Sequence, residues 1–320
     1  LKNTHMLDPQ VQALLDLIKE KGVPPTHLLS PEDARKAYSE RRFYSQPAAP
    51  EVKNLHDFDI PGKVGLIKAR SYRPIHSSDN ETLAALVYFH GGGCVIGDLD
   101  THDVLCRELA NLANIAVFSI DYRLAPENPF PAAIEDCATS TQWLHDHAKE
   151  LHIDPKRIAV GGDSAGGNLA AVTCLILKEE KSFKPAFQLL IYPMIDTIGQ
   201  FKSLITNGDG YLLTKDAVEY YLNHYLPDAS MKQDWRVAAL LAKDHSDLPP
   251  ALVITAGFDP LRDEGLAYAD KLSASGVPTQ YICFERQIHG FILMGRILDE
   301  ANTAVKLCAQ TLIDNLKTKA

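Results

Sequence analysis

Residues 158–172 combine a short apolar strand, a turn of small residues and the beginning of a helix. Their sequence is Ile158-Ala159-Val160-Gly161-Gly162-Asp163-Ser164-Ala165-Gly166-Gly167-Asn168-Leu169-Ala170-Ala171-Val172. Residues 162–166 match G-x-S-x-G, a pattern in which a strained strand-to-helix turn holds a serine outward. Gly162 and Gly166 suit such a turn, because it leaves no room for Cβ atoms on either side of Ser164. The context therefore favours a nucleophilic Ser164 over an ordinary small-residue turn.

Strands and helices alternate on both sides of this segment. We predict strands at residues 52–60, 63–73, 83–89, 115–120, 157–160, 187–192, 251–255 and 279–284, and helices at about 101–114, 131–149, 165–180, 260–275 and 299–316. Pro61-Gly62 indicates a hairpin, so the first two strands should be antiparallel. The alternation predicts an α/β protein with an eight-stranded, mostly parallel sheet flanked by helices.

Two segments fall outside this rhythm. Asp8-Pro9 and Ser30-Pro31 are helix-start signals, and they predict helices at 8–20 and from 30 to about 44 that precede any strand. Residues 192–248 contain no convincing strand and one helix, at 214–225. We therefore expect N-terminal cap helices in residues 1–50, a core in residues 51–320, and a cap insertion at about 196–245. An insertion at the carboxyl end of a parallel sheet lies over the ligand crevice.

A second glycine-rich turn, His90-Gly91-Gly92-Gly93, directly follows the predicted strand 83–89. Its backbone N–H groups are unobstructed by side chains, which suits an oxyanion hole. The amide of Ala165, the residue after the serine, would complete the donor set. A flexible turn or a phosphate-binding loop is the alternative, but the lysine and the glycine spacing of phosphate loops are absent. His90 is expected to orient the loop.

A nucleophilic serine needs a base, and the base needs an acid that orients it. Asp259 follows the predicted strand 251–255, and His289 follows the strand 279–284. The order Ser, acid, His is the one that this strand–turn–helix arrangement uses. Asp263 and Glu264 are the rival acids, but both fall inside the next predicted helix. An isolated histidine would more often be structural; here position and chain order favour His289 as the base.

The composition narrows the classes of function. The chain of 320 residues has 32 basic and 41 acidic residues, a net charge of −9, and its densest basic cluster is Arg41-Arg42. A nucleic-acid-binding protein needs a positive footprint, so no nucleic-acid partner is expected. No H-E-x-x-H motif occurs, and we expect neither a metal nor a cofactor.

The chain carries no sign of a membrane span or of a signal peptide. Its longest uncharged stretch, residues 82–97, contains His90 and several glycines, so it is not a membrane helix. The six cysteines lack C-x-x-C spacing and mostly lie in apolar runs; we expect buried, reduced thiols rather than disulfides. A cytoplasmic location follows as the expectation.

Five motifs in order give the chain a family resemblance. They are His90-Gly91-Gly92-Gly93, Asp121-Tyr122-Arg123-Leu124-Ala125-Pro126-Glu127 with Pro129-Phe130-Pro131, Gly162-Asp163-Ser164-Ala165-Gly166-Gly167, Asp259-Pro260-Leu261-Arg262-Asp263, and His289-Gly290-Phe291. The chain resembles the hormone-sensitive-lipase-like (bacterial type IV) carboxylesterases, which have the α/β-hydrolase fold, over about residues 50–300. The N-terminal helices also look like the cap of that family.

The resemblance implies specific roles. Ser164 would be the nucleophile, His289 the base and Asp259 its orienting acid, with the amides of Gly92, Gly93 and Ala165 as oxyanion donors. The expected activity is a serine carboxylesterase for esters of short to medium acyl chains, without a cofactor. By analogy a homodimer through an edge strand or terminal helix is possible.

Two departures from the family pattern bear on substrate preference. Cys94 stands where the family usually has an aromatic residue, and Arg286-Gln287-Ile288 precedes the histidine where a small residue is common. Both are expected near the pocket. The apolar residues of the insertion, around Phe201, Leu204, Tyr211 and Leu212, are expected to limit acyl length, although the sequence leaves open which of them face the pocket.

Two other functions remain open on the same scaffold. An arylformamidase or other small-amide hydrolase would use the same three residues. A non-catalytic receptor for a small ligand would need the fold and the lid but not the catalytic residues, and the presence of all three argues against it.

Overall fold

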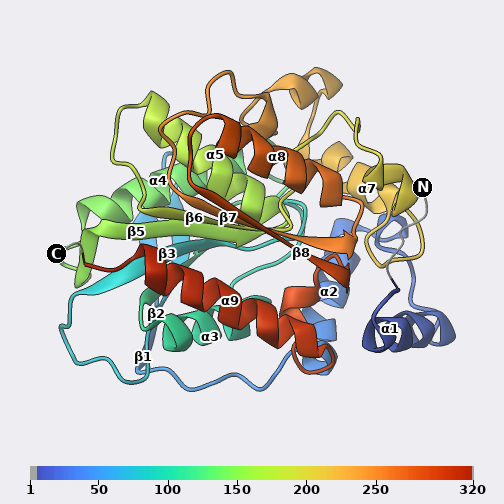
Figure 1. Ribbon diagram of the computed structural model, residues 1–320, viewed down its shortest axis with the longest axis horizontal. Helices are drawn as coiled ribbons and strands as arrows, with labels where there is room; N and C mark the ends of the chain where they lie inside the picture. Colours follow the sequence, from blue (N-terminus) through green and yellow to red (C-terminus); the bar gives the residue numbers. More distant parts are fainter. Residues whose placement is uncertain (1–5, 319–320) are drawn as a thin grey trace.

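The computed structural model describes residues 6–318, and an eight-stranded sheet runs through its centre (Figure 1). The strand order is β1-β2-β4-β3-β5-β6-β7-β8. The strands are β1 (Asn54–Pro61), β2 (Leu66–Arg73), β3 (Leu83–Phe89), β4 (Ala116–Asp121), β5 (Ile153–Asp163), β6 (Phe187–Ile191), β7 (Ala251–Phe258) and β8 (Thr279–Ile288). Strand β2 pairs antiparallel with β1 and β4, and the other pairings are parallel. The predicted α/β sheet with its antiparallel first pair is confirmed.

Helices cover both faces of the sheet because its central strands are apolar on both sides. All residues of β3 and β7 are buried. Side chains alternate between two cores: Val87 and Phe89 pack toward α4 (Ala132–Asp146) and α5 (Ala165–Glu179), while Leu86 and Tyr88 pack toward α3 (Asp103–Ala113) and α9 (Asp299–Asn315). This is the pattern of a doubly covered parallel sheet. Helix α8 (Arg262–Ala274) follows β7.

The predicted helix starts outside the sheet are confirmed by their caps. The side chain of Asp8 accepts the amide of Gln10 before α1 (Pro9–Glu20), and the side chain of Ser30 accepts the amide of Asp33 before α2 (Pro31–Ser45). Thr214 caps α7 (Lys215–Tyr225) in the same way. Each cap satisfies an amide that the first helical turn leaves without a partner.

Two strands extend further than the sequence predicted, and the extension matters for the site. Strand β7 runs to Phe258 and β8 to Ile288, and these two residues are paired in the sheet register after a bulge. The backbone pairing continues past the apolar cores that the prediction used, and it ends immediately before Asp259 and His289. Strand β5 also starts earlier than predicted, because Ile153 pairs with Leu83.

Outside the sheet, α1, α2 and α7 lie beyond the carboxyl end of β8 (Figure 1). Between β6 and β7 lie α6 (Ser203–Thr206), α7, and the short 3-10 helices η2 (Ala229–Gln233) and η3 (Ala239–Leu241). The 3-10 helix η1 (Thr26–Leu28) joins α1 to α2 and contacts α7, with His27 Nε2 3.9 Å from Asp216 Oδ2. Residues 1–5 and 319–320 of the expected segments lie outside the described residues. Among the helices of residues 6–318, none is long and apolar enough to cross a membrane.

A substitution at Gly166 tests how closely α5 packs against the end of β3. A Cβ at Gly166 would lie 1.9 Å from the carbonyl oxygen of Phe89, so we expect Gly166→Ala to destabilise the protein by at least about 1–3 kcal/mol. Urea unfolding measures this change. Gly65→Ala is the control, because nothing lies within 4 Å of its added Cβ. Equal unfolding midpoints for the two variants would contradict this packing.

Candidate active site

Ser164 stands at a strained turn between β5 and α5. Its φ of 58° and ψ of −120° lie in a region that side chains rarely adopt. A Cβ at Gly162 would lie 2.4 Å from the carbonyl carbon and oxygen of Gly166 and from the carbonyl oxygen of Phe89. The Ser164 amide donates to the carbonyl of Ile191, and the Ser164 carbonyl accepts the amide of Met194. These contacts hold the serine outward at the carboxyl end of the sheet.

Three residues predicted from separate parts of the chain form one hydrogen-bonded line. His289 Nε2 lies 2.8 Å from Ser164 Oγ, and His289 Nδ1 lies 2.6 Å from Asp259 Oδ2. With Nδ1 donating to the carboxylate, Nε2 is free to accept the serine hydroxyl proton. The line therefore has the geometry of a nucleophile, a base and an orienting acid.

The sheet register explains how the acid reaches the histidine. Phe258 and Ile288 are paired, so the next residues, Asp259 and His289, leave neighbouring strands side by side. Asp259 is fully buried, and its second oxygen accepts the amide of Leu261 at 2.8 Å. Asn207, from the segment between β6 and β7, donates to the carbonyl oxygen of Asp259 at 3.1 Å.

The two rival acids, Asp263 and Glu264, accept hydrogen bonds from backbone amides of another segment. Asp263 accepts the amide of Ser203 at 2.9 Å. Glu264 is buried, and burial raises the pKa of its carboxyl although the amides of Ile195 and Asp196 donate to it. Both side chains thus hold the segment that follows β6, and neither contacts His289.

The glycine loop lies beside Ser164. Gly92 has a φ of +118° and Gly93 one of +62°, and both line the cleft that contains Ser164 and His289. Within residues 6–318, neither their amides nor that of Ala165 donates to a protein acceptor. Three N–H groups are therefore available near the serine.

The two departures from the family pattern lie next to the lining of the cleft and not in it, because Cys94 follows Gly93 and Ile288 precedes His289. Cys94 is buried, and burial raises the pKa of its thiol to about 12. An aromatic ring nonetheless covers the loop: Tyr221 of α7 lies 2.3 Å from where a Cβ at Gly93 would stand. Gln287 is buried and donates instead to Asp8 and Glu300, away from the cleft.

Asp163 and His102, a buried hydrogen-bonded pair that the sequence analysis did not predict, support the glycine loop. Asp163 Oδ1 accepts the Gly91 amide at 3.0 Å and the Tyr88 hydroxyl at 2.7 Å, and His102 Nε2 lies 3.1 Å from Asp163 Oδ2. Burial alone would raise the pKa of Asp163, but His102 and Tyr88 outweigh it and lower the pKa. Asp163 thus connects the serine turn to the glycine loop as a carboxylate. Nothing in the local pattern around His102 signals this contact.

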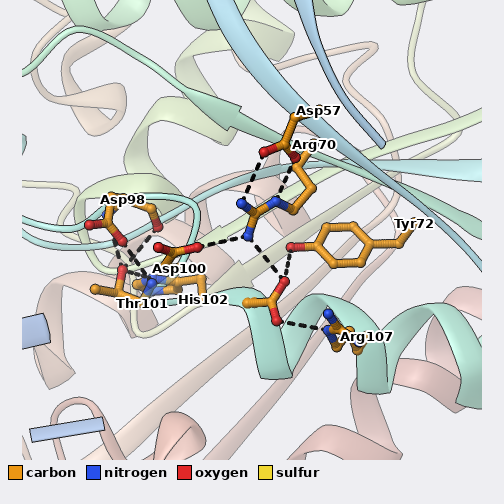
Figure 2. A network of polar contacts seen from close by, with 9 residues as sticks. Asp57, Arg70, Tyr72, Asp98, Asp100, Thr101, His102 and Arg107 are labelled. Carbon is orange, nitrogen blue, oxygen red and sulfur yellow. Dashed lines mark hydrogen bonds and ion pairs between the residues drawn. The ribbon is translucent and has the colours of Figure 1, made fainter. Parts of the chain in front are cut away.

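Figure 2 shows how the segment carrying His102 is anchored. Thr101 Oγ1 lies 2.9 Å from His102 Nδ1, and the Thr101 amide donates to Asp98. Arg70 of β2 reaches the carboxylates of Asp57, Asp100 and Asp103, and Tyr72 and Arg107 also donate to Asp103. This network ties the loop before α3 to the sheet.

His90, predicted to orient the loop, is fully buried and does not line the cleft. Its Nδ1 lies 2.7 Å from the Gly91 carbonyl, and its carbonyl accepts the Tyr122 hydroxyl at 2.6 Å. Its ring stacks on that of Tyr122 at 4.3 Å. Burial, assisted by His102, lowers the pKa of His90 to about 4. A neutral His90 therefore lies beneath the glycine loop.

The cleft has a volume of about 90 Å³ and is walled largely by the segments outside the sheet. Of the insertion residues considered in the sequence analysis, Leu212 lines it, whereas Phe201, Leu204 and Tyr211 do not. Tyr211 packs on Phe258 instead, with the ring centroids 5.0 Å apart. Other lining residues were not predicted: Thr26, Tyr38, Arg41, Met194, Leu213 and Tyr221. Residues 6–318 contain no group of three or more histidine, cysteine or acidic side chains placed to hold a metal ion.

Comparisons with known proteins agree on one family. A family model described as alpha/beta hydrolase fold matches residues 86–293. A carboxylic ester hydrolase of Mycobacterium tuberculosis, LipN, is 42% identical over 294 residues, which cover 90% of this chain and 77% of the relative. An ethyl acetate hydrolase of Pseudomonas putida is 35% identical, with 97% and 99% coverage. The structure of an ester hydrolase from the Lake Arreo metagenome, complexed with a bipyridine phosphonate derivative, superposes with a TM-score of 0.94 at 40% identity, covering 98% of this chain and 100% of that one.

Because His90 is buried and neutral, we predict that the free energy of unfolding falls in acid. The unfolded chain takes up a proton near pH 6.5, whereas the folded chain does so only near pH 4. The unfolded state therefore binds more protons in this window, and the free energy of unfolding falls as the pH drops from 6.5 to 4, by about 3 kcal/mol from this residue.

Urea unfolding between pH 7 and pH 4.5 measures this contribution. His90→Gln is expected to lose less stability with falling pH than the parent, whatever its stability at pH 7. His76→Gln, at an exposed position, is the control and should follow the parent. Parallel pH curves for the parent and His90→Gln would contradict the interpretation.

Proposed function

The chain belongs to the hormone-sensitive-lipase-like family of α/β-hydrolases and is a carboxylic ester hydrolase, and on this premise we propose that Ser164, His289 and Asp259 are its catalytic triad. The observation that carries the proposal is the pair of short contacts at His289, 2.8 Å to Ser164 Oγ and 2.6 Å to Asp259 Oδ2. Each ring nitrogen of His289 thus has one partner: Nε2 contacts the nucleophile and Nδ1 contacts the acid.

The proposed reaction is a two-step acyl transfer. Ser164 Oγ attacks the ester carbonyl while His289 Nε2 takes the hydroxyl proton. The tetrahedral intermediate collapses when its bond to the alcohol oxygen breaks, and His289 gives the proton to the leaving alcohol. Water then attacks the acyl-enzyme and loses a proton to His289. The bond between the acyl carbon and Ser164 Oγ breaks, His289 returns the proton to Ser164 Oγ, and the carboxylic acid leaves. Asp259 stays ionised and stabilises the imidazolium.

The amides of Gly92, Gly93 and Ala165 are the proposed oxyanion donors. They border the cleft or begin α5 next to Ser164, and no described protein group accepts from them. The N-terminal end of α5 adds a positive dipole end there. Preorganised donors of this kind stabilise the charge that forms in the transition state, each contributing about 3 kcal/mol.

Short to medium acyl chains are the proposed substrates. The cleft of about 90 Å³ is well below the roughly 300–1,000 Å³ of sites for drug-sized ligands. Leu212, Leu213 and Tyr221 come from the segment between β6 and β7 and occupy the space that a long chain would need. A small, partly apolar cleft favours a short acyl group.

We propose that residues 1–50 and about 196–245 act together as the cap over this cleft. Thr26 and Tyr38 from the first segment and Leu213 and Tyr221 from the second line the same cleft. The two segments also contact each other through η1 and α7. Residues 51–320, apart from the insertion, would then be the catalytic core.

We also propose a cytoplasmic location and a homodimer, each from a different observation. All six cysteines are free, five of them buried, which suits a reducing compartment. Strand β8 ends the sheet order and leaves an edge that a second copy could pair with. Cell fractionation tests the location, and analytical ultracentrifugation tests the dimer.

Hydrolysis of 4-nitrophenyl esters from acetyl to dodecanoyl tests the nucleophile and the chain length together. We expect the highest kcat/KM for short esters and loss of nearly all turnover in Ser164→Ala, because the nucleophile is removed. Ser273→Ala, an exposed serine on α8, is the matched control and should keep full activity. If the folded parent hydrolyses no ester of the series, the assignment fails, and amide substrates and ligand binding would be tested next.

A second variant separates the orienting acid from its neighbour. Asp259→Asn should lower kcat on the order of 10³–10⁴-fold, because an amide favours the wrong tautomer of His289. Asp263→Asn is the control on the same loop and helix, and it should leave kcat within a few fold because Asp263 contacts Ser203 rather than His289. Steady-state kinetics at pH 8 give both values, and comparable losses in the two variants would overturn the role of Asp259.

A further inference from the structure

An arginine without a carboxylate partner lies at the mouth of the Ser164 cleft. Arg41, near the end of α2, lines the cleft together with Ser164 and His289. Within residues 6–318 it forms no ion pair, and its guanidinium carbon lies 4.6 Å from the ring centroid of Tyr38. A cation held over an aromatic ring keeps its N–H groups available for another ligand.

Another arginine of α2, Arg35, illustrates a structural role. Arg35 donates to both carboxylate oxygens of Glu127 at 3.0 and 2.7 Å, and to the carbonyls of Val95 and Ala125. Its donors are thereby used within the fold. Arg41 has no comparable set of acceptors, so holding α2 in place does not explain its guanidinium.

A second guanidinium adjoins the first. Arg42 lines a smaller cavity that shares Tyr38, Arg41 and Gly290 with the cleft. Its Nη1 is buried and has no hydrogen-bond partner among the described residues. A buried, unsatisfied charged donor is costly, and an anionic group between the two arginines would satisfy it.

The charges around the cleft favour an anion at this place. The cleft is lined by one carboxylate, Asp163, and that group is already bound by His102, Tyr88 and Gly91. The field of Arg41 reaches into the cleft: burial raises the pKa of Tyr221 to about 12, and Arg41 opposes this rise.

We propose that Arg41, assisted by Arg42, is an anion subsite that selects esters carrying a carboxylate group. The planar fork of a guanidinium matches a carboxylate with two parallel hydrogen bonds. The inference rests on the proposed function, because it assumes that the ester is cleaved at Ser164. It adds the substrate class: a monoester of a dicarboxylic acid, or an ester of a hydroxy acid.

Two matched substrate pairs test the subsite. Monomethyl adipate differs from methyl hexanoate by a carboxylate in place of a methyl group on the acyl side. 3-Acetoxybenzoate differs from 3-methylphenyl acetate in the same way on the alcohol side. The measured quantity is the ratio of kcat/KM for the charged ester to kcat/KM for its neutral partner, and the pair that shows the effect identifies which side of the substrate faces α2.

Arg41→Gln is expected to lower this ratio about tenfold for one of the pairs, as for loss of a hydrogen bond to a charged group. Arg41→Lys should retain part of the ratio, because it keeps the charge but not the fork. Raising the salt concentration from 0.05 to 0.5 M should lower the ratio in the parent, since screening weakens the attraction. Lys36→Gln removes a cation from an exposed position of the same helix and should leave the ratio unchanged.

Ratios for both pairs that are the same in the parent, Arg41→Gln and Lys36→Gln would overturn the subsite. Calorimetric titration of monomethyl adipate into Ser164→Ala, with and without Arg41→Gln, measures binding without turnover. The same titration is made with 3-acetoxybenzoate. Weaker binding of either ligand in the double variant supports the subsite, and equal binding of both ligands contradicts it. Failure of the proposed function has a different signature, because the parent would then hydrolyse none of the four esters while the calorimetric comparison would still report on Arg41.

Discussion

The carbonyl oxygen of Phe89, the last residue of β3, lies where a Cβ at Gly162 or Gly166 would have to stand. Because both positions are glycine, the end of β5 and the start of α5 can approach β3 closely enough for Ser164 to occupy its strained turn. The same approach places Asp163 against the amide of Gly91, so the glycine loop and the serine turn are fixed relative to each other. The geometry of the site thus depends on a contact that excludes side chains.

The register of β7 and β8 supplies the rest of the site. Pairing up to Phe258 and Ile288 lets Asp259 and His289 emerge next to each other, and burial of Asp259 removes water that would compete for the His289 Nδ1 proton. A bulge shortly before this pair shifts the register at the very end of the sheet. The acid and the base are therefore placed by backbone hydrogen bonds, which are less mobile than loop contacts.

The charged side chains around the cleft differ in whether they have partners within the protein. Asp163 and His102 are hydrogen-bonded to each other next to the glycine loop, and the network around Arg70 anchors the segment that carries His102 (Figure 2). Arg41 and Arg42 have no carboxylate partner among the described residues, and Arg41 lines the cleft that contains Ser164.

The sequence by itself determined where the elements and motifs fall along the chain. It showed which runs are strands, where Ser164 and the glycine loop lie, and that Asp259 and His289 each follow a strand. Those features are local, since periodicity, helix caps and small residues act within a few positions. It did not reveal His102 as the partner of Asp163, or Arg41 and Tyr221 as walls of the cleft. These contacts join residues tens or hundreds of positions apart, and only the packing of α2 and α7 over the sheet decides which side chains meet there.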